Sequence, residues 1–137
     1  MASSIDGKLA PYNDIALLIG RIFVGVLFVM AAYAKFKGLA GTTGYLTKLG
    51  VPAPSIMAPV VAIFELLAGV LIIVGFKTRL AALAIAIFVV IAALLAHTNF
   101  ADQNQLNHFL KNVAIAGGCL AFFVSGAGLY SVDARRP

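Results

Sequence analysis

The sequence predicts an all-α integral membrane protein, a bundle of four transmembrane helices, on two observations. The first is composition: 62% of the 137 residues are hydrophobic and 11% are charged, against about 45–50% and about 25% in a typical soluble domain. The second is arrangement, because the apolar residues gather in four segments near the length of roughly 20 residues that a spanning helix needs. Only a bilayer accounts for so much apolar surface in a chain of this length.

The expected helices span about residues 15–35, 56–76, 80–97 and 109–130. Asn13 and Asp14 precede the first helix, and both residue types favour the N-cap position. The second helix has Pro59 in its first turn, where proline is tolerated. The third is rich in alanine and ends at His97, and the fourth opens with polar residues and continues with small ones. Together they form a single membrane domain over residues 1–137.

Three of these helices are predicted to carry a distinctive face, because their residues recur at intervals of three and four. The face of the first helix joins two cations through Arg21, Gly25, Phe28, Ala32 and Lys35. The face of the second helix surrounds Glu65 with Ala58, Ala62, Gly69 and Phe76. A third face, on the fourth helix, consists of Ala114, Gly118, Ala121, Ser125 and Gly128. Small residues let a neighbouring helix approach closely in lipid, so we expect these faces to pack.

Glu65 is an acid in the middle of the apolar run VAIFELLAGV. A charged side chain at the bilayer centre costs at least about 2.5–3.5 kcal/mol, so Glu65 is expected to face the bundle. Arg21 and Lys35 are expected to set its charge state from opposite ends. Two interpretations stay open: a buried ion pair that fixes the helix register, or a polar site that binds a ligand or moves a proton.

The candidate ligand-binding residues are the polar groups expected around a partly hydrated pocket: Arg21, Lys35, Glu65, His97, Lys111 and Asn112. No residue is assigned a catalytic role. His97 and His108 show no ligand spacing and no clustered carboxylates, so no metal site is expected. Cys119 is the single cysteine, and we interpret it as a small packing residue.

The net charge of +5 is better explained by membrane topology and anionic lipid than by nucleic acid, because no continuous basic patch with aromatic residues exists. One end of the bundle is expected to carry Lys8, Lys77, Arg79, Arg135 and Arg136. The other is expected to carry Lys35, Lys37, Lys48 and Lys111. Short basic loops favour the cytoplasm, and this small bias predicts that both termini are cytoplasmic.

Three stretches resemble the DoxX family: GRIFVGVLFVMAAYAKFKG, IFELLAGVLIIVGFKTRLAAL and KNVAIAGGCLAFFVSGAGLYSVD. The resemblance covers roughly residues 15–133. It implies a small bacterial inner-membrane protein with four helices. Its polar positions fall on Arg21, Lys35, Glu65, Thr78, Arg79, His97 and Asn112. The chain departs from the family at residues 31–34, where many relatives have a glycine before the lysine.

The resemblance also implies a class of function. Some relatives resemble the small subunits of a thiosulfate:quinone oxidoreductase, and others are associated with quinone or catechol detoxification or with oxidative-stress complexes. The first hypothesis is therefore a pocket that binds a quinone or another small redox-active molecule, in a respiratory or oxidative-stress system, with no built-in cofactor. Lys35, His97 and Asn112 would donate hydrogen bonds to a quinone headgroup.

Two other hypotheses compete with ligand binding. One is a non-enzymatic scaffold subunit that recruits an oxidoreductase partner to the membrane through linkers 35–55 and 98–111. The other is a small transporter, which is disfavoured because the helices show no internal repeat.

Overall fold

The computed structural model describes residues 4–136, and this part of the chain is entirely helical and irregular, without a strand. The elements are α1 (Ser4–Leu9), η1 (Ala10–Tyr12), α2 (Asn13–Lys37), α3 (Leu39–Lys48), α4 (Pro54–Val74), α5 (Thr78–Ala96), α6 (Gln103–Ser125) and η2 (Asp133–Arg135). Four helical stretches, which contain α2, α4, α5 and α6, are long and apolar enough to cross a membrane. The all-α membrane fold is confirmed.

The fourth helix differs most from its expected bounds. It begins at Gln103, six residues early, because the Asp102 side chain caps it by accepting a hydrogen bond from the Asn104 amide (2.9 Å). It ends at Ser125 instead of Tyr130, because Gly126 has a φ of 77°. This left-handed backbone is readily adopted only by glycine, and it turns the chain out of the helix.

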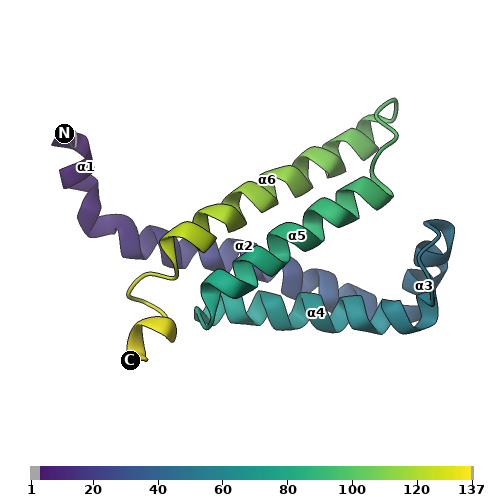
Figure 1. Cartoon of the computed structure of the whole chain (residues 1–137), viewed down its shortest axis with the longest axis horizontal. Helices are drawn as coiled ribbons and strands as arrows, with labels where there is room; N and C mark the ends of the chain where they lie inside the picture. Colours follow the sequence, from purple (N-terminus) through teal and green to yellow (C-terminus); the bar gives the residue numbers. More distant parts are fainter. Residues whose placement is uncertain (1–3, 137) are drawn as a thin grey trace.

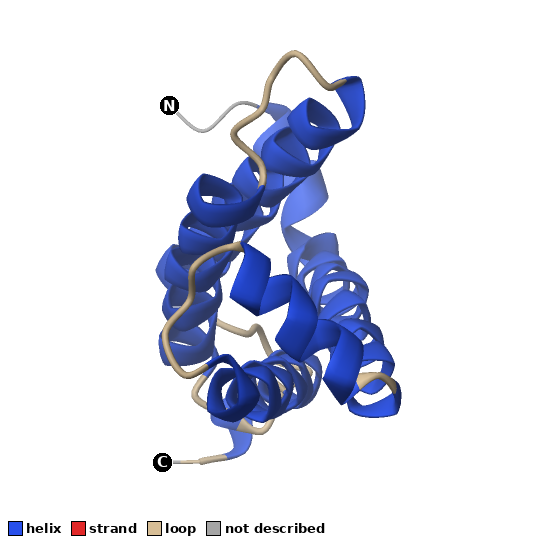
Figure 2. Ribbon diagram, turned by 90° about the vertical axis from the view of Figure 1, so that its right-hand side faces the viewer, coloured by secondary structure: helices blue, strands red, loops and turns tan. Residues whose placement is uncertain are grey.

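The linker expected over residues 35–55 contains the additional helix α3. At ten residues it is far too short to span a bilayer, and it lacks the long apolar run by which the other helices were found. Figure 1 shows α3 at the end of the molecule opposite both termini. In Figure 2 it lies across this end, between the ends of α2 and α4.

The long helices form two hairpins. One pairs α2 with α4, and the other pairs α5 with α6. The hairpins meet near the termini and diverge toward α3 (Figure 1). Near the meeting point the ring of Phe122 on α6 packs against Gly20 on α2. The shared core consists mainly of small residues around a few large ones, namely Phe28, Ile72, Ile85 and Phe122.

The α2–α4 contact matches the predicted faces except at Phe76, which follows Gly75 and lies beyond the end of α4. The buried residues of α2 are Arg21, Gly25, Phe28 and Ala32, and those of α4 include Ala58, Ala62, Glu65 and Gly69. The two backbones nearly touch where Gly25 meets Gly69. A Cβ added at Gly25 would lie 2.7 Å from the Gly69 carbonyl oxygen and would collide with Ile73. Close glycine contacts of this kind drive helix association in lipid.

The predicted packing face of α6 is wrong. Ala114, Gly118, Ala121 and Ser125 are exposed, and a Cβ at Gly117 or Gly118 would meet nothing within 4 Å. The face that packs in this single chain instead contains Ala116, Cys119 and Phe122, because contact with α5 requires residues that fill the groove. Cys119 is fully buried, which confirms its packing role.

We predict that Gly25→Ala destabilises the fold while Gly117→Ala does not. Overpacking typically costs about 1–3 kcal/mol, and the clash at Gly25 involves backbone that cannot move independently. Gly117 is an ideal control because its surroundings are open. Thermal unfolding in detergent, followed by loss of helical circular dichroism, measures both. Equal melting temperatures for the two variants would contradict the α2–α4 contact.

Candidate functional site

The candidate site is built on an ion pair between α2 and α4. Lys35 Nζ lies 2.8 Å from Glu65 Oε2 and donates a hydrogen bond to Oε1 at 3.1 Å. The Glu65 side chain is only 7% exposed, whereas the Lys35 side chain is 27% exposed. Lys35 thus reaches the acid from the end of its helix, where the long stem lets the ammonium approach a more polar level.

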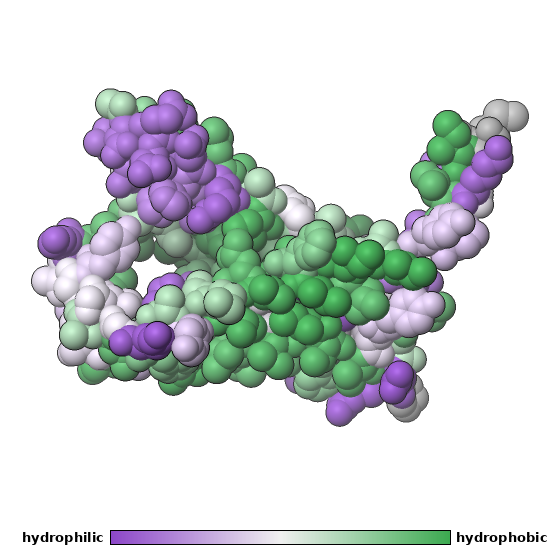
Figure 3. Space-filling model, turned by 180° about the vertical axis from the view of Figure 1, so that it is seen from behind, coloured by the Kyte–Doolittle hydropathy of each residue, from purple (hydrophilic) through white to green (hydrophobic). Residues whose placement is uncertain are grey.

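The ion pair lies on the wall of a cavity of about 540 Å³ between the diverging hairpins. Figure 3 shows the molecule hollowed between the polar α5–α6 connection and the end that holds α3. All five of the longer helices contribute to the wall, and most of it is apolar. The rings of Phe64 and Phe88 pack with centroids 4.9 Å apart on this wall. A volume of this size suits a small organic molecule.

A second group of polar side chains lies where α5 and α6 pack together, and three of its members, His97, Lys111 and Asn112, line the cavity. The rings of His97 and His108 stack with centroids 5.0 Å apart. His97 Nδ1 lies 3.3 Å from Gln105 Oε1, and Lys111 Nζ lies 3.4 Å from His108 Nδ1. Asn112 Nδ2 donates to the Val89 carbonyl (3.2 Å). Among residues 4–136 no three His, Cys, Asp or Glu side chains gather as metal ligands.

The structure therefore brings together five of the six candidate residues: Lys35, Glu65, His97, Lys111 and Asn112 all line the one cavity. Arg21 lies elsewhere. The expectation that Arg21 helps to set the charge of Glu65 is wrong, because its guanidinium donates to the carbonyls of Ile72 (3.4 Å), Ile73 (3.1 Å) and Tyr130. The last carbonyls of a helix have no intrahelical partner, and Arg21 supplies one at the end of α4.

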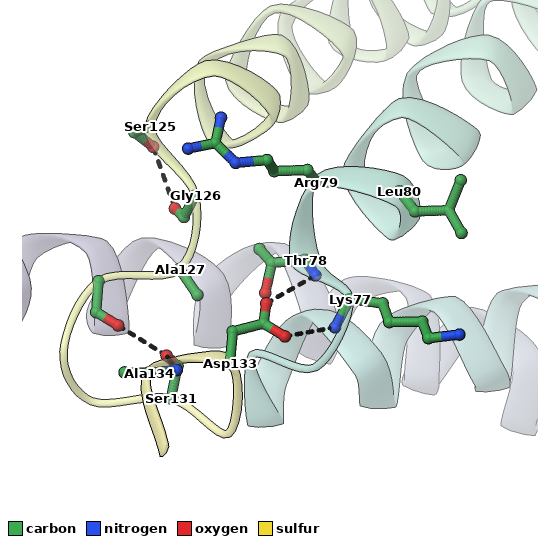
Figure 4. Close-up of a pocket in the computed structure, with 11 residues that line it drawn as sticks. Lys77, Thr78, Arg79, Leu80, Ser125, Gly126, Ala127, Ser131, Asp133 and Ala134 are labelled. Atoms are coloured by element: carbon green, nitrogen blue, oxygen red, sulfur yellow. Dashed lines mark hydrogen bonds between the residues drawn. The ribbon is translucent and has the colours of Figure 1, made fainter. Parts of the chain in front are cut away.

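The end of the molecule near the termini is held by polar contacts within the protein. The Asp133 carboxylate accepts hydrogen bonds from the amides of Lys77 (2.8 Å) and Thr78 (2.9 Å) at the start of α5 (Figure 4). Arg79 donates to the carbonyls of Phe123 (2.7 Å) and Val124 at the end of α6. An open depression of about 650 Å³ lies here, but these polar groups cap helix ends.

Sequence reasoning missed the contribution of α3 to the cavity. Thr42, Tyr45, Leu46 and Leu49 face it from this helix and its end. Their spacing of three, one and three residues is the amphipathic signal that would have revealed the helix. The aromatic wall of Phe64 and Phe88 joins α4 to α5, and nothing local in the sequence reports such a pairing.

A family model described as DoxX matches residues 16–98, which is more than half of the chain. The chain belongs to the DoxX family. The matched region contains Lys35, Glu65 and His97, whereas Lys111 and Asn112 of the same cavity follow it on α6. The resemblance expected from the sequence is confirmed.

Two relatives from Escherichia coli (strain K12) match over most of their length. Inner membrane protein YqjF is 40% identical over 121 residues, which is 88% of this chain and 92% of the relative. Inner membrane protein YphA is 34% identical over 128 residues, 90% of this chain and 91% of the relative. A third, "Putative oxidoreductase CatD" from Bacillus subtilis (strain 168), is 37% identical over 67 residues, about half of each chain. No solved structure matches significantly.

The environment of Asp133 predicts how the stability of this DoxX chain depends on pH. Partial burial raises the pKa of Asp133, but hydrogen bonds from the amides of Thr78 and Lys77 and the charge of Arg21 outweigh it, so the pKa lies below its ordinary value of 3.8. A lowered carboxyl pKa stabilises the fold above the ordinary value, and this stabilisation is lost as the pH falls through the folded-state pKa.

We therefore expect wild type to melt at a higher temperature than Asp133→Asn at pH 6–7, with the difference shrinking below about pH 4. Asparagine has nearly the same shape but lacks the charge and one of the two oxygens that accept the amide hydrogen bonds, so the change of the difference with pH, and not its size at one pH, reports the ionisation. Thermal unfolding in detergent across this pH range makes the measurement. A difference that stays constant down to the lowest pH would show that the charge of Asp133 is irrelevant.

Proposed function

We propose that the cavity binds a small, lipid-soluble, redox-active molecule of the quinone class. The observation that carries this proposal is the Lys35–Glu65 pair, a charged pair in a wall that is otherwise mostly apolar, beside a space that fits a small molecule. Ionisable groups at membrane depth are expensive and usually serve a function. Replacing such a pair by packed apolar residues is often neutral or stabilising. Binding of a ligand by the pair explains why this chain has two charges here instead.

The cavity wall offers matching chemistry for each part of such a molecule. Phe64 and Phe88 provide an aromatic wall for a flat ring. Lys35 and Lys111 provide hydrogen-bond donors for carbonyl oxygens. The apolar side chains Leu27, Val60, Ile91 and Leu95 line the cavity and are more than a third exposed. On this proposal the apolar lining opens to lipid, and a membrane-dissolved molecule enters laterally.

The relatives support a redox setting and a location. CatD bears the name of an oxidoreductase, and YqjF and YphA are named as inner membrane proteins. We place this chain in the bacterial inner membrane with both termini in the cytoplasm, in keeping with their position at one end of the fold (Figure 1). Electrons for the bound molecule would come from an oxidoreductase partner, which keeps the role of a recruiting subunit compatible with ligand binding.

Binding of a decyl-substituted benzoquinone to the detergent-purified protein tests the proposal. We expect Lys35→Met to weaken binding by at least about tenfold, the factor that a hydrogen bond to a charged group gives. Lys37→Met is the matched control, because Lys37 lies two residues away on the same helix, is exposed and does not line the cavity. Circular dichroism confirms that both variants are folded.

Wild-type affinity in a folded Lys35→Met variant, or equal losses in both variants, would contradict binding at the ion pair. If wild type binds no quinone at all, the pair is structural, and the scaffold hypothesis becomes the better account of the protein.

A further inference from the structure

The charged residues that line the cavity do not balance. They are two lysines and one acid, namely Lys35, Lys111 and Glu65. The Lys35 ammonium lies 2.8 Å from the Glu65 carboxylate, so this pair is neutral as a unit. Within residues 4–136 no carboxylate forms an ion pair with Lys111. One positive charge of the cavity wall is therefore uncompensated.

The contact of Lys111 with its neighbour on α6 leaves this charge in place. Lys111 Nζ lies 3.4 Å from His108 Nδ1. An ammonium has hydrogens to donate and no lone pair, so this ring nitrogen accepts the hydrogen bond and carries no hydrogen of its own. His108 is thus a neutral partner in this contact.

Lys111 also lies inside a helix that is apolar enough to cross the membrane. It is about two turns, or about 12 Å, beyond the start of α6 at Gln103. Ionisable side chains within spanning segments usually pair with an opposite charge or mark a binding site or a path for ions. Lys111 has no acid partner in the described chain and it lines the cavity, so its counter-charge is expected to come from what the cavity binds.

The surroundings of the cavity carry the same sign of charge. Lys37 at the end of α2 and Lys48 at the end of α3 are both exposed, and α3 lies at the end of the molecule that holds the cavity (Figure 1). The acids at this end are Glu65 and Asp102, so the lysines outnumber them. A cleft with low-dielectric walls and an excess of one charge concentrates ligands of the opposite charge.

We infer that the cavity binds its ligand as an anion, a compound of the quinone class that bears an ionised hydroxyl group; this inference rests on the proposed function. The negative oxygen would pair with the charge of Lys111, and the aromatic wall of Phe64 and Phe88 would hold the ring. A neutral carbonyl oxygen gains a hydrogen bond there but no ion pair. The attraction between opposite charges grows as the ligand displaces water from the site.

Two matched probes isolate the negative charge: a decyl-substituted hydroxynaphthoquinone and its methyl ether. The hydroxyl group of the first is ionised at neutral pH, whereas the ether keeps the ring system, the tail and the oxygens but cannot ionise. Equilibrium binding to the full chain in a non-ionic detergent gives a dissociation constant for each probe. The ratio of the two constants is compared between variants and wild type, so that the different partition of the probes into detergent cancels.

Three variants test the role of the charge. Lys111→Gln removes the charge and keeps a hydrogen-bond donor, whereas Lys111→Arg keeps both. Lys8→Gln is the matched control, because it makes the same change in net charge on α1, at the opposite end of the molecule (Figure 1).

We expect Lys111→Gln to shift the ratio about fivefold in favour of the ether, the factor that an ion pair of about 1 kcal/mol gives. Lys111→Arg and Lys8→Gln should leave the ratio unchanged. Circular dichroism confirms that the variants are folded. If Lys111→Gln does not fold, the salt dependence of wild-type binding decides the question, because only the anion should bind more weakly as the ionic strength rises.

An unchanged ratio in Lys111→Gln would overturn the inference and leave the proposed function standing, because Lys111 would then be a lysine that only water solvates. An equal shift in Lys8→Gln would overturn it too, since the effect would come from the net charge of the protein and not from the cavity. If both naphthoquinones fail to bind while the decyl-substituted benzoquinone binds, the inference alone is wrong. Failure of all three probes would overturn both the inference and the proposed function.

Discussion

The buried guanidinium of Arg21 is the interaction on which the arrangement of the helices depends. It has no exposed surface, and it joins α2 to the last carbonyls of α4 and to Tyr130 in the C-terminal segment. An unsatisfied carbonyl in lipid costs several kcal/mol. Separating the helices at this end would take Arg21 away from these carbonyls and is therefore unfavourable. With the hairpins fixed here, their divergence toward the far end leaves a space that α3 lies across and the side chains do not fill.

The polar residues of the chain divide between two tasks. Near the termini, Arg21, Arg79 and Asp133 each bond backbone groups at a helix end, so these side chains hold the fold together. At the opposite end, Lys35 and Glu65 bond to each other on the wall of a cavity. The partners of the charged side chains, backbone groups at one end and a second side chain at the other, distinguish the end near the termini from the end that holds the cavity.

The spanning helices and most polar residues of the cavity could be predicted from the sequence. The partners of the charged side chains and the packing of α6 could not, for physical reasons. Periodicity identified the spanning helices and the buried faces of Arg21 and Glu65, because burial in lipid imposes a strict pattern. The sequence could not show that Glu65 pairs with Lys35 and not with Arg21, because helix spacing places both cations on one face. Only the backbone geometry shows which carbonyls need Arg21 as a donor. The packing face of α6 was mispredicted for a similar reason. Small residues permit close packing, but the sequence does not show which helix they pack against.

We propose that Lys35 and Glu65 serve a ligand and not the helix register. Native mass spectrometry of the protein purified in mild detergent tests it directly, with wild type beside the double variant Lys35→Met/Glu65→Leu. The double variant leaves no lone charge, and replacing both members of a buried pair by apolar residues is often neutral for stability. We predict a defined small-molecule adduct on wild type and none on the folded double variant. A double variant that carries the same adduct, or a wild type that carries none while the variant unfolds, would contradict it.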